Sequence, residues 1–286
     1  MSTESVDPRY EELDRWPTAI AVRAMLEGQL AAIAAVTGCV DAIAAAADAA
    51  AERLRGGEGR LIYVGAGTSG RVAVQDGVEL SPTYDWPEAR LGFLLAGGMA
   101  ALSASVEGAE DDIAAASREI ADAAAGDVVI GVAASGRTPY TLAAIEAARA
   151  AGALTIGLAN NRKTPLLVAA EHALLLDTGS EVVAGSTRMK AGTAQKAALN
   201  LLSTAIMLRL GKVYRGRMVE MRATNVKLAG RARAMVAELA GVDGDSARAA
   251  LAATDGHIAG AVLVAMGRDP AALDRHGGLR AAIDAD

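Results

Sequence analysis

The stretch Leu61–Arg71, with the sequence LIYVGAGTSGR, joins a short apolar run to a turn rich in glycine and hydroxyl side chains. The apolar run Leu61–Val64 is short and uninterrupted, which predicts a buried strand. The glycines after it match the GxGxxG spacing found where a strand leads into a helix at a dinucleotide site. The stretch therefore predicts a strand, an anion-binding turn and a helix in direct succession.

The GxGxxG spacing alone does not establish a dinucleotide site. A nicotinamide enzyme also needs an acidic residue at the end of the following strand to hold the ribose hydroxyls. Asp85 and Glu88 precede the next predicted strand, Leu91–Leu95, instead of ending it. Thr68 and Ser69 offer hydroxyl donors at a helix start, where backbone N–H groups also approach an anion, so the turn suits a monophosphate equally well.

Short apolar runs alternate with helical stretches through the middle of the chain. Further buried strands are predicted at Leu91–Leu95, Val128–Val132, Leu154–Leu158 and Ala173–Leu176. Helices are predicted at Ala19–Thr37, Val40–Arg55, Pro139–Ala151 and Arg188–Leu210. This alternation predicts an α/β fold with a parallel five-stranded sheet flanked by helices, in which ligands bind beyond the carboxyl ends of the strands.

The last part of the chain has short helical stretches separated by glycines. Helices are predicted at Arg231–Leu239, Ser246–Ala253 and Ile258–Met266. They predict a small three-helix bundle, which needs docking or dimer contacts because a bundle of this size is marginally stable alone. The chain is thus divided into an N-terminal helical segment, a central sheet domain and a C-terminal bundle, at residues 1–55, 56–225 and 226–286.

Composition and charge limit the classes of partner. The 286 residues are 52% hydrophobic, which allows a sizeable core, and carry a net charge of -6. Lys and Arg are spread through the chain instead of forming a run, so neither nucleic acid nor a membrane surface is expected as a partner. No membrane span is expected, because Asp41, Asp48 and Glu52 interrupt the alanine-rich stretches.

The N-terminal stretch and the cysteine content point to one compartment. Met1–Arg15 is acidic, unlike the basic and then apolar layout of a secretory signal. Cys39 is the only cysteine, so no internal disulfide can form, and a small buried thiol is expected there. A reducing, cytoplasmic location is therefore expected.

Two further turns repeat the pattern of hydroxyl, glycine and cation. Ala134–Thr138, ASGRT, follows the predicted strand Val128–Val132 and echoes Thr68–Arg71 at the equivalent strand end. Gly185–Lys196 is a hydroxyl-rich entry to the helix Arg188–Leu210, with cations near its start that oppose the helix dipole unless an anion is bound. Each turn alone could be an ordinary capped turn. The three together predict a site for a sugar with a phosphate and several hydroxyls.

Gly65–Arg71, Ser135–Thr138 and above all Glu181–Lys196 resemble the sugar isomerase (SIS) fold as it occurs in N-acetylmuramic acid 6-phosphate etherases. The resemblance covers nearly the whole chain and includes Thr3-Glu4, Glu79–Thr83, Val106–Asp112, Gly211–Tyr214 and Ala223–Lys227. It implies a carbon–oxygen lyase that converts N-acetylmuramic acid 6-phosphate and water to N-acetylglucosamine 6-phosphate and D-lactate. It also implies a cytoplasmic homodimer in cell-wall sugar recycling that needs neither metal nor organic cofactor.

The three turns supply the candidate substrate-binding residues. They are Gly67, Thr68, Ser69, Ser135, Gly136, Arg137, Thr138, Ser186 and Thr187, with Lys190 as a further candidate.

By resemblance, the acid and base positions of the family fall on Glu79 and Glu110. In the open-chain sugar the C2 proton lies next to the C1 aldehyde and the lactyl oxygen leaves from C3, so elimination needs one base and one acid. Val78 and Leu80 flank Glu79 with apolar groups, which predicts a raised pKa and the acid role. Glu110 lies at the start of a predicted helix, Asp111–Ala123, whose dipole favours the ionised form of a base.

Other interpretations of these residues stay open. Glu110, Asp111 and Asp112 are also typical of a solvated helix start, and the charges of the two aspartates would raise the pKa of Glu110 against the helix dipole. A phosphosugar-binding regulator similar to the glucokinase regulatory proteins would share every turn. A sugar-phosphate isomerase would also place a base near C2. The presence of both Glu79 and Glu110 favours the etherase.

Three positions depart from the family pattern. Ser180 stands where a proline is usual, Asp7 replaces an asparagine, and Leu80 replaces a cysteine or a similar small residue. None of these changes removes a proton-transfer group. No metal site is expected either, because the histidines lack the spacing of ligands or of a nucleophile and its base: His172, His257 and His276.

Overall fold

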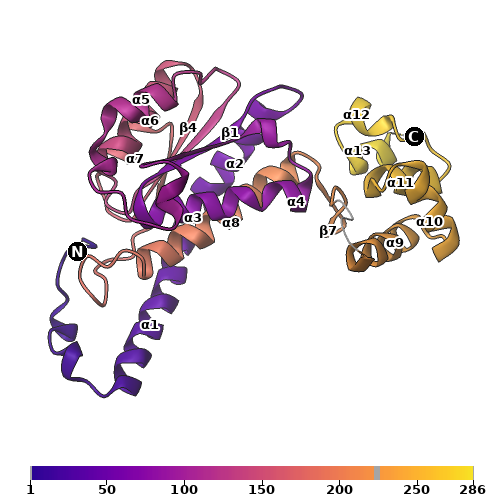
Figure 1. Cartoon of the computed structure of the whole chain (residues 1–286). Helices are drawn as coiled ribbons and strands as arrows, with labels where there is room; N and C mark the ends of the chain where they lie inside the picture. The colour runs from indigo at the N-terminus through magenta and orange to yellow at the C-terminus, as the bar shows by residue number, and fades with distance from the viewer. Residues whose placement is uncertain (1, 222–225, 286) are drawn as a thin grey trace. The chain divides into compact units, whose positions relative to one another are not determined.

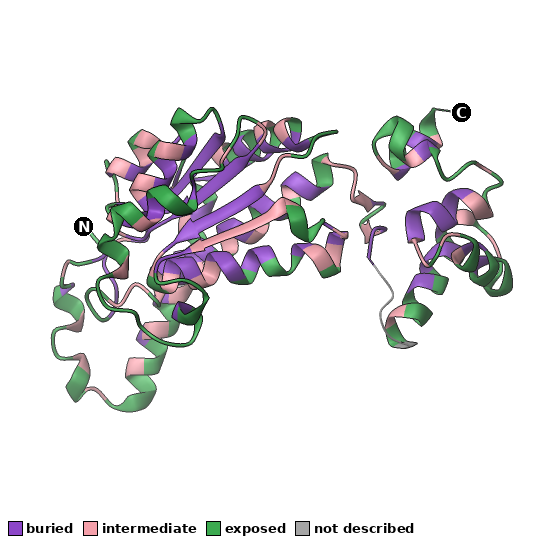
Figure 2. Cartoon of the chain, turned by 45° about the horizontal axis from the view of Figure 1, so that its top comes forward, coloured by how far each residue is buried: buried purple, intermediate pink, exposed green. Residues whose placement is uncertain are grey.

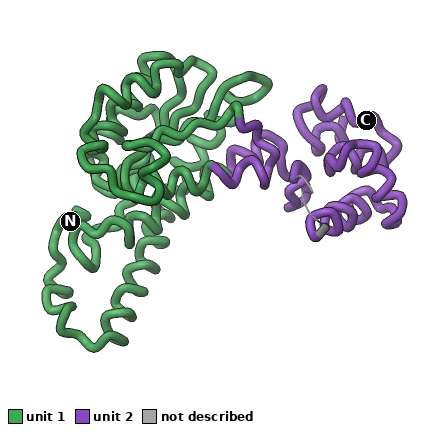
Figure 3. Tube along the Cα trace, viewed as in Figure 1, with its two compact units in different colours: residues 1–77, 89–203 green, residues 78–88, 204–286 purple. Residues whose placement is uncertain are grey.

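The computed structural model of the chain describes residues 2–221 and 226–285 and forms two compact units. The first unit comprises residues 1–77 and 89–203, and the second comprises residues 78–88 and 204–286 (Figure 3). The segment limits that the sequence predicts, at residues 55 and 225, stay predictions. Of the family stretch Ala223–Lys227, residues 223–225 lie outside the described residues.

The first unit is built on a parallel sheet with the strand order β2-β1-β3-β4-β5 (Figure 1). Its strands are β1 (Leu61–Gly65), β2 (Leu91–Leu95), β3 (Val128–Val132), β4 (Leu154–Ala159) and β5 (His172–Leu175). All of the pairings are parallel, and Leu61 of β1 lies opposite both Leu91 of β2 and Val128 of β3. The predicted fold class is confirmed, with each strand end placed to within one residue.

Helices cover both faces of this sheet. Figure 1 shows α5 (Ile113–Glu119), α6 (Pro139–Ala150) and α7 (Pro165–Ala169) on one face, and α2 (Val40–Leu54), α3 (Gly67–Val78) and the first part of α8 (Lys190–Arg209) on the other. Every residue of β1, β3 and β4 is buried, as expected for parallel strands covered on both faces. These strands can therefore contribute functional groups to solvent only through the turns at their ends.

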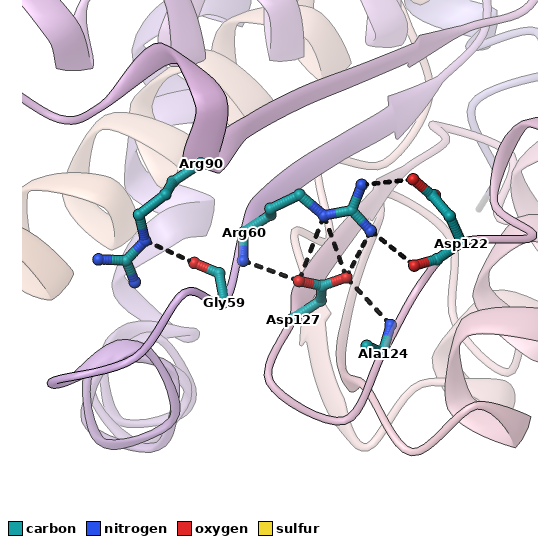
Figure 4. A network of polar contacts seen from close by, with 6 residues as sticks. All are labelled: Gly59, Arg60, Arg90, Asp122, Ala124 and Asp127. Carbon is teal, nitrogen blue, oxygen red and sulfur yellow. Dashed lines mark hydrogen bonds and ion pairs between the residues drawn. The ribbon is translucent and has the colours of Figure 1, made fainter.

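The amino ends of the central strands are tied together by an ion-pair network (Figure 4). The guanidinium of Arg60, just before β1, donates to the carboxylate of Asp127, just before β3, at 2.7 Å, and the backbone N–H of Arg60 donates to the same carboxylate at 2.8 Å. Burial disfavours the charged form of Asp127, but the hydrogen bonds from Arg60 outweigh it and lower the pKa of this carboxyl. The network fixes one edge of the sheet, and the candidate site lies at the opposite edge.

Helix α1 (Thr18–Thr37) precedes the sheet and projects from the rest of its unit (Figures 1 and 2). Its side chains Val22, Leu26 and Leu30 are 52%, 57% and 64% exposed and form one stripe, because they are four residues apart. By length and composition, α1 is the one helix in the described part of the chain that is apolar enough to cross a membrane, with a mean hydropathy of 1.5 and 22% of that stretch buried. By these two criteria the expectation that no segment could span a membrane is wrong, since the interrupting charges lie in α2.

The second unit contains α4 (Leu80–Tyr84), a hairpin of β6 (Val213–Tyr214) and β7 (Arg217–Met218), and the C-terminal helices. These helices are α9 (Val226–Ala240), α10 (Gly244–Ala253), α11 (Ile258–Ala265), α12 (Ala272–His276) and α13 (Leu279–Asp284). The described residues thus form five C-terminal helices, and the predicted three-helix bundle is corrected. The last two helices have 5 and 6 residues, too few for the sequence to show a helical period, yet Leu279 and Ala282 are buried in the same core as α9 and α11.

Candidate active site

The three predicted turns meet at the carboxyl edge of the sheet. They line a cavity of about 390 Å³ in the first unit. Its lining includes predicted residues from all three turns together with one predicted catalytic residue: Gly67, Thr68, Ser69, Glu110, Ser135, Arg137, Thr138 and Thr187. The lining therefore combines acids with residues that carry hydroxyls and one guanidinium, and hydroxyls and guanidinium are groups that bind phosphate and sugar oxygens.

The first turn places the start of α3 directly at the end of β1. Gly67 begins α3 with a φ of +52°, a conformation that favours glycine. A Cβ on Gly70 would lie 2.8 Å from the carbonyl carbon of Gly65 and 2.4 Å from the Leu95 side chain, so the helix approaches the sheet closely only without one. The N–H groups of this first helical turn have no partners inside the helix. These N–H groups and the hydroxyl of Ser69, a buried residue, are donors of the kind that bind anions at helix starts.

The second turn, Ala134–Thr138, connects β3 to α6. The Ser135 hydroxyl accepts the backbone N–H of Arg137 at 3.1 Å, and Gly136 has a φ of +63°. Gly136 does not line the cavity itself, but a Cβ there would lie 2.3 Å from the Thr164 hydroxyl. Thr138 is the N-cap residue of α6, and its side chain makes no capping bond. Ser135 and Thr138 thus line the cavity just before and at a second helix start.

The third turn contributes less than the sequence predicts. Thr187 lines the cavity, whereas Ser186 and Lys190 do not. The Lys190 ammonium instead donates to the backbone carbonyl of Ser180 at 2.8 Å. Helix α8 begins at Lys190, two residues later than predicted. A substrate contact by Lys190 stays a prediction.

Glu181 is a buried acid that the sequence did not single out as a functional position. Its two carboxylate oxygens accept the backbone N–H groups of Lys190 and Ala191, each at 2.9 Å. A carboxylate is favoured there by the positive end of the helix dipole. Glu181 thereby closes the loop that carries Thr187. Its role could not be predicted from the sequence, because the known capping patterns place the acid only about three residues from the helix start.

The arginines of the first two turns lie in different environments. Arg71 donates to the backbone carbonyl of Ala101 at 2.8 Å and of Ala104 at 3.2 Å. It therefore fixes the loop after β2. Arg137 is exposed and lines the cavity. The two turns look equivalent in sequence, but Arg137 lines this cavity, whereas Arg71 lines a second, adjoining one.

Glu110 lies where the first cavity meets a second one of about 430 Å³, which the loop after β2 lines with Ser105 and Glu107. Glu110 is exposed and belongs to a 3-10 turn, Ala109–Asp111. The predicted helix Asp111–Ala123 is shorter in the structure, and the side chain of Asp112 caps it by accepting the Ala115 N–H at 2.8 Å. Glu110 thus lies before the start of α5, and Asp112 holds the capping position of that helix.

Glu79 belongs to the second unit, where it is the N-cap residue of α4 and its side chain makes no capping bond. It is exposed, as is Val78, whereas Leu80 is buried. The predicted shielding of Glu79 by apolar neighbours is therefore not found in the single chain, since Leu80 turns its side chain into the core instead. The catalytic assignment of Glu79 stays a prediction from the family.

Two further acids line the cavity without having been predicted, Glu4 and Asp111.

Another acid, Asp76 of α3, is buried and accepts hydrogen bonds from the Tyr63 hydroxyl at 2.8 Å and the Asn200 amide at 2.6 Å. Burial raises the pKa of Asp76, and these bonds oppose the rise. This network joins β1, α3 and α8. It thereby holds α3, whose first residues line the cavity, in place. Within the described residues, no group of three or more His, Cys, Asp or Glu side chains is placed to hold a metal ion.

Comparison with known proteins decides between the possible families. The chain is 50% identical to the N-acetylmuramic acid 6-phosphate etherase of Deinococcus radiodurans over 92% of this chain and 86% of that protein. It is 45% identical to the etherase of Mycolicibacterium smegmatis over 100% of this chain and 98% of that protein, and 43% identical to that of Yersinia pestis over 98% of each. The chain belongs to the N-acetylmuramic acid 6-phosphate etherase family. The predicted resemblance is confirmed.

The fold assignment has independent support. The profile of the glucokinase regulatory protein N-terminal SIS domain matches residues 39–149, and that of the SIS domain matches residues 99–205. A putative phosphosugar isomerase from Bacteroides fragilis has the same fold, with a TM-score of 0.51 and 18% identity over 70% of this chain and 95% of that one. The family models and this solved structure thus support the SIS fold, and the three relatives named above, which match nearly the whole chain, are etherases.

Proposed function

We propose that this chain cleaves the D-lactyl ether of N-acetylmuramic acid 6-phosphate and forms N-acetylglucosamine 6-phosphate and D-lactate. The etherase activity follows from membership in the family, since identity of 43% to 50% extends over nearly the whole chain. The observation that carries the assignment of the site is the cavity in which the hydroxyl-bearing turns and Glu110 come together. A regulator of the same fold would need the turns but not the acids.

The turns are proposed to bind the phosphate of the substrate. The N–H groups at the start of α3 and the hydroxyls of Thr68 and Ser69 surround one side of the cavity. Ser135, Thr138 and Arg137 supply further donors from the second turn. A guanidinium and several hydroxyls match the three oxygens and the charge of a phosphate monoester. This anchor would hold the sugar while its C2 and C3 atoms react.

Glu110 and Glu79 are proposed as the base and the acid of the elimination. Glu110 removes the C2 proton, the electrons of that bond form the C2–C3 double bond, and the bond from C3 to the lactyl oxygen breaks. Glu79 protonates that oxygen, so D-lactate leaves. Water then adds to C3, giving one proton to Glu79 while Glu110 returns a proton to C2. Both residues end in their starting protonation states, as a catalytic cycle requires.

The division of labour between the two acids can be tested in deuterated water. The wild-type chain is expected to release lactate and to incorporate deuterium at C2. Glu79→Gln is expected to lower lactate release by about 10²- to 10⁴-fold while C2 exchange persists, because removal of the proton needs only the base. Glu110→Gln is expected to lose both reactions. Mass spectrometry of the sugar and an enzymatic lactate assay measure the two steps.

Glu88→Gln serves as the control, because Glu88 is exposed and lies in the same short segment of the second unit as Glu79. It is expected to behave as wild type. Equal loss of exchange and lactate release in Glu79→Gln would contradict the acid role. Exchange without any lactate from the wild-type chain would instead favour a sugar-phosphate isomerase.

A homodimer is proposed from the surface of α1. Its exposed stripe of Val22, Leu26 and Leu30 is apolar, and Ile33 is also 49% exposed. A second copy of this chain is the proposed partner, because contiguous exposed apolar surface of this kind is typical of association sites. The net charge of -6 opposes attraction to an anionic membrane, although α1 is long and apolar enough to span one.

A cytoplasmic location is also proposed. Cys39 is free and buried, which suits a reducing compartment. The acidic net charge likewise disfavours nucleic acid as a partner.

A further inference from the structure

Segment Ser2–Ser5 is held against the site by a buried threonine. Thr3 is fully buried, although Ser2 and Glu4 on either side of it are exposed. Its backbone N–H donates to the Asn161 side-chain oxygen at 3.0 Å, and its hydroxyl accepts the Asn161 amide at 2.9 Å. Its carbonyl accepts the backbone N–H of Gly185 at 3.0 Å. Thr3 thus uses all of its backbone groups and its side chain to attach this segment.

These bonds connect the segment to two of the three substrate turns. The Asn161 amide that binds the Thr3 hydroxyl also donates to the carbonyl of Ala134, directly before Ser135, at 3.0 Å. Gly185 belongs to the third turn, which carries Thr187. Because Thr3 is bonded to Gly185 directly and to Ala134 through Asn161, the position of the next residue, Glu4, is set by the same scaffold that sets the cavity wall.

Glu4 lies at the cavity itself. It lines the cavity together with Ser135, Arg137 and Thr187. A Cβ on Gly185 would lie 2.9 Å from one carboxylate oxygen of Glu4, which places this carboxylate against the third turn. The other oxygen accepts only a long hydrogen bond from Thr3, at 3.4 Å. In the described part of the chain no cation pairs with Glu4, so its carboxylate keeps most of its capacity to accept hydrogen bonds.

The charge of Glu4 determines which part of a ligand it can accept. A carboxylate repels the phosphate and the lactyl carboxylate of the substrate, and it accepts hydrogen bonds from neutral O–H and N–H groups. Those donors are the sugar hydroxyls and the acetamido N–H. A phosphate bound at the turns and an acid that takes a sugar donor would together fix the direction of the sugar in the cavity.

We propose that Glu4 is a substrate-contacting residue that accepts a hydrogen bond from a hydroxyl or the acetamido N–H of the bound phosphosugar. Thr3 is a positioning residue that acts through Glu4. The inference rests on the proposed function of the cavity as the phosphosugar site. It assigns part of the substrate recognition to a segment far in sequence from the turns and the proposed catalytic residues.

The experiment compares Glu4→Ala with the wild-type chain in two binding measurements by calorimetry. Affinity for N-acetylglucosamine 6-phosphate, which has the hydroxyls and the amide, is expected to fall about ten- to hundred-fold, the usual loss for a hydrogen bond to a charged group. Affinity for inorganic phosphate, which has no sugar donors, is expected to stay within about two-fold. The thermal midpoint of unfolding is expected to be unchanged, because Glu4 is exposed.

Glu12→Gln is the control, since Glu12 is another exposed acid near the N-terminus and pairs with the nearby, exposed Arg15. It is expected to bind both ligands as wild type. Glu4→Ala that binds the sugar phosphate as tightly as wild type would overturn the proposal. Lactate release by the wild-type chain, measured in parallel, tests the proposed function separately, so the two failures are distinguishable.

The role of Thr3 is tested by Thr3→Val, which keeps the shape but removes the hydroxyl. Thr3→Val is expected to lower the affinity for N-acetylglucosamine 6-phosphate in the wild-type chain. In a chain that already carries Glu4→Ala, Thr3→Val should cause no further loss, because the effects of two substitutions that act through the same contact do not add. An additive loss in the double variant would overturn the positioning role of Thr3.

Discussion

At the scale of single residues, the start of α3 depends on the absence of a side chain at Gly70. Gly70→Ala would bring a Cβ to 2.8 Å from the Gly65 carbonyl carbon, and backbone cannot move away as a flexible side chain can. We expect a loss of about 1–3 kcal/mol in the free energy of unfolding, as for other overpacked sites. We also expect a higher KM, because Thr68 and Ser69 would shift with the helix. Urea unfolding and lactate assays measure the two effects.

The control for this substitution is Gly230→Ala in α9. Gly230 is exposed, and a Cβ there would meet nothing within 4 Å. Alanine is expected to stabilise this helix by about 0.5–1 kcal/mol, because it loses less backbone entropy than glycine. A neutral or stabilising Gly70→Ala would contradict the close approach of β1 and α3.

The sequence predicts individual site residues well where a turn and a strand end lie together. Thr68 and Ser135 were predicted because hydroxyls beside glycines at strand ends of one sheet come together by topology. Glu4 and Glu181 were missed because their contacts join segments far apart in the chain. Lys190 was assigned to the cavity from its place at a helix start, but its ammonium bonds to the Ser180 carbonyl, a tertiary contact that spacing cannot reveal.

At the scale of elements, boundaries differ from the prediction where tertiary bonds override local preference. The alanine-rich stretch Asp111–Ala123 predicts a longer helix than α5, which ends at Glu119. Downstream, the backbone N–H of Ala124 donates to Asp127 at 3.1 Å, and this bond requires the chain to turn before β3. The buried strands were placed closely because their apolar runs carry no competing signal.

The bond between Arg60 and Asp127 predicts a dependence of stability on pH. The folded-state pKa of Asp127 is lowered, so its contribution is complete above the ordinary carboxyl pKa of about 3.9 and is lost as the pH falls through the lower folded value. Asp127→Asn is therefore expected to lower the free energy of unfolding by about 1.5–3 kcal/mol at pH 7. The difference from wild type should shrink only below about pH 4.

Asp122→Asn is the control, because Asp122 pairs with the same arginine but its side chain is 74% exposed. It is expected to change stability by less than about 1 kcal/mol. Urea unfolding at a series of pH values measures all three proteins. A difference between Asp127→Asn and wild type that disappears already near pH 6 would show that another group is responsible.

At the scale of the whole molecule, the number of C-terminal helices and the surface of α1 were the least predictable features. Helices α12 and α13 are too short to show a period, and they are stabilised by burial of residues such as Leu279 in a shared core. The stripe on α1 cannot be recognised from sequence, because the apolar residues of a buried and of an exposed helix look alike. Its exposure in the structure is what makes association of two copies testable.

If α1 is the dimer surface, charge on its stripe should separate the subunits. The wild-type chain of 28.9 kDa is expected to have about twice that mass by light scattering after gel filtration at micromolar concentration. Leu26→Asp combined with Leu30→Asp is expected to give the monomer mass, because each aspartate would be buried without a partner in the interface. Val168→Asp is the control, since Val168 is 77% exposed on α7, away from this stripe, and should leave the dimer intact. A wild-type chain that is monomeric and sediments with lipid vesicles would instead identify α1 as a membrane-binding helix. A double variant that stays dimeric would place the interface on another surface.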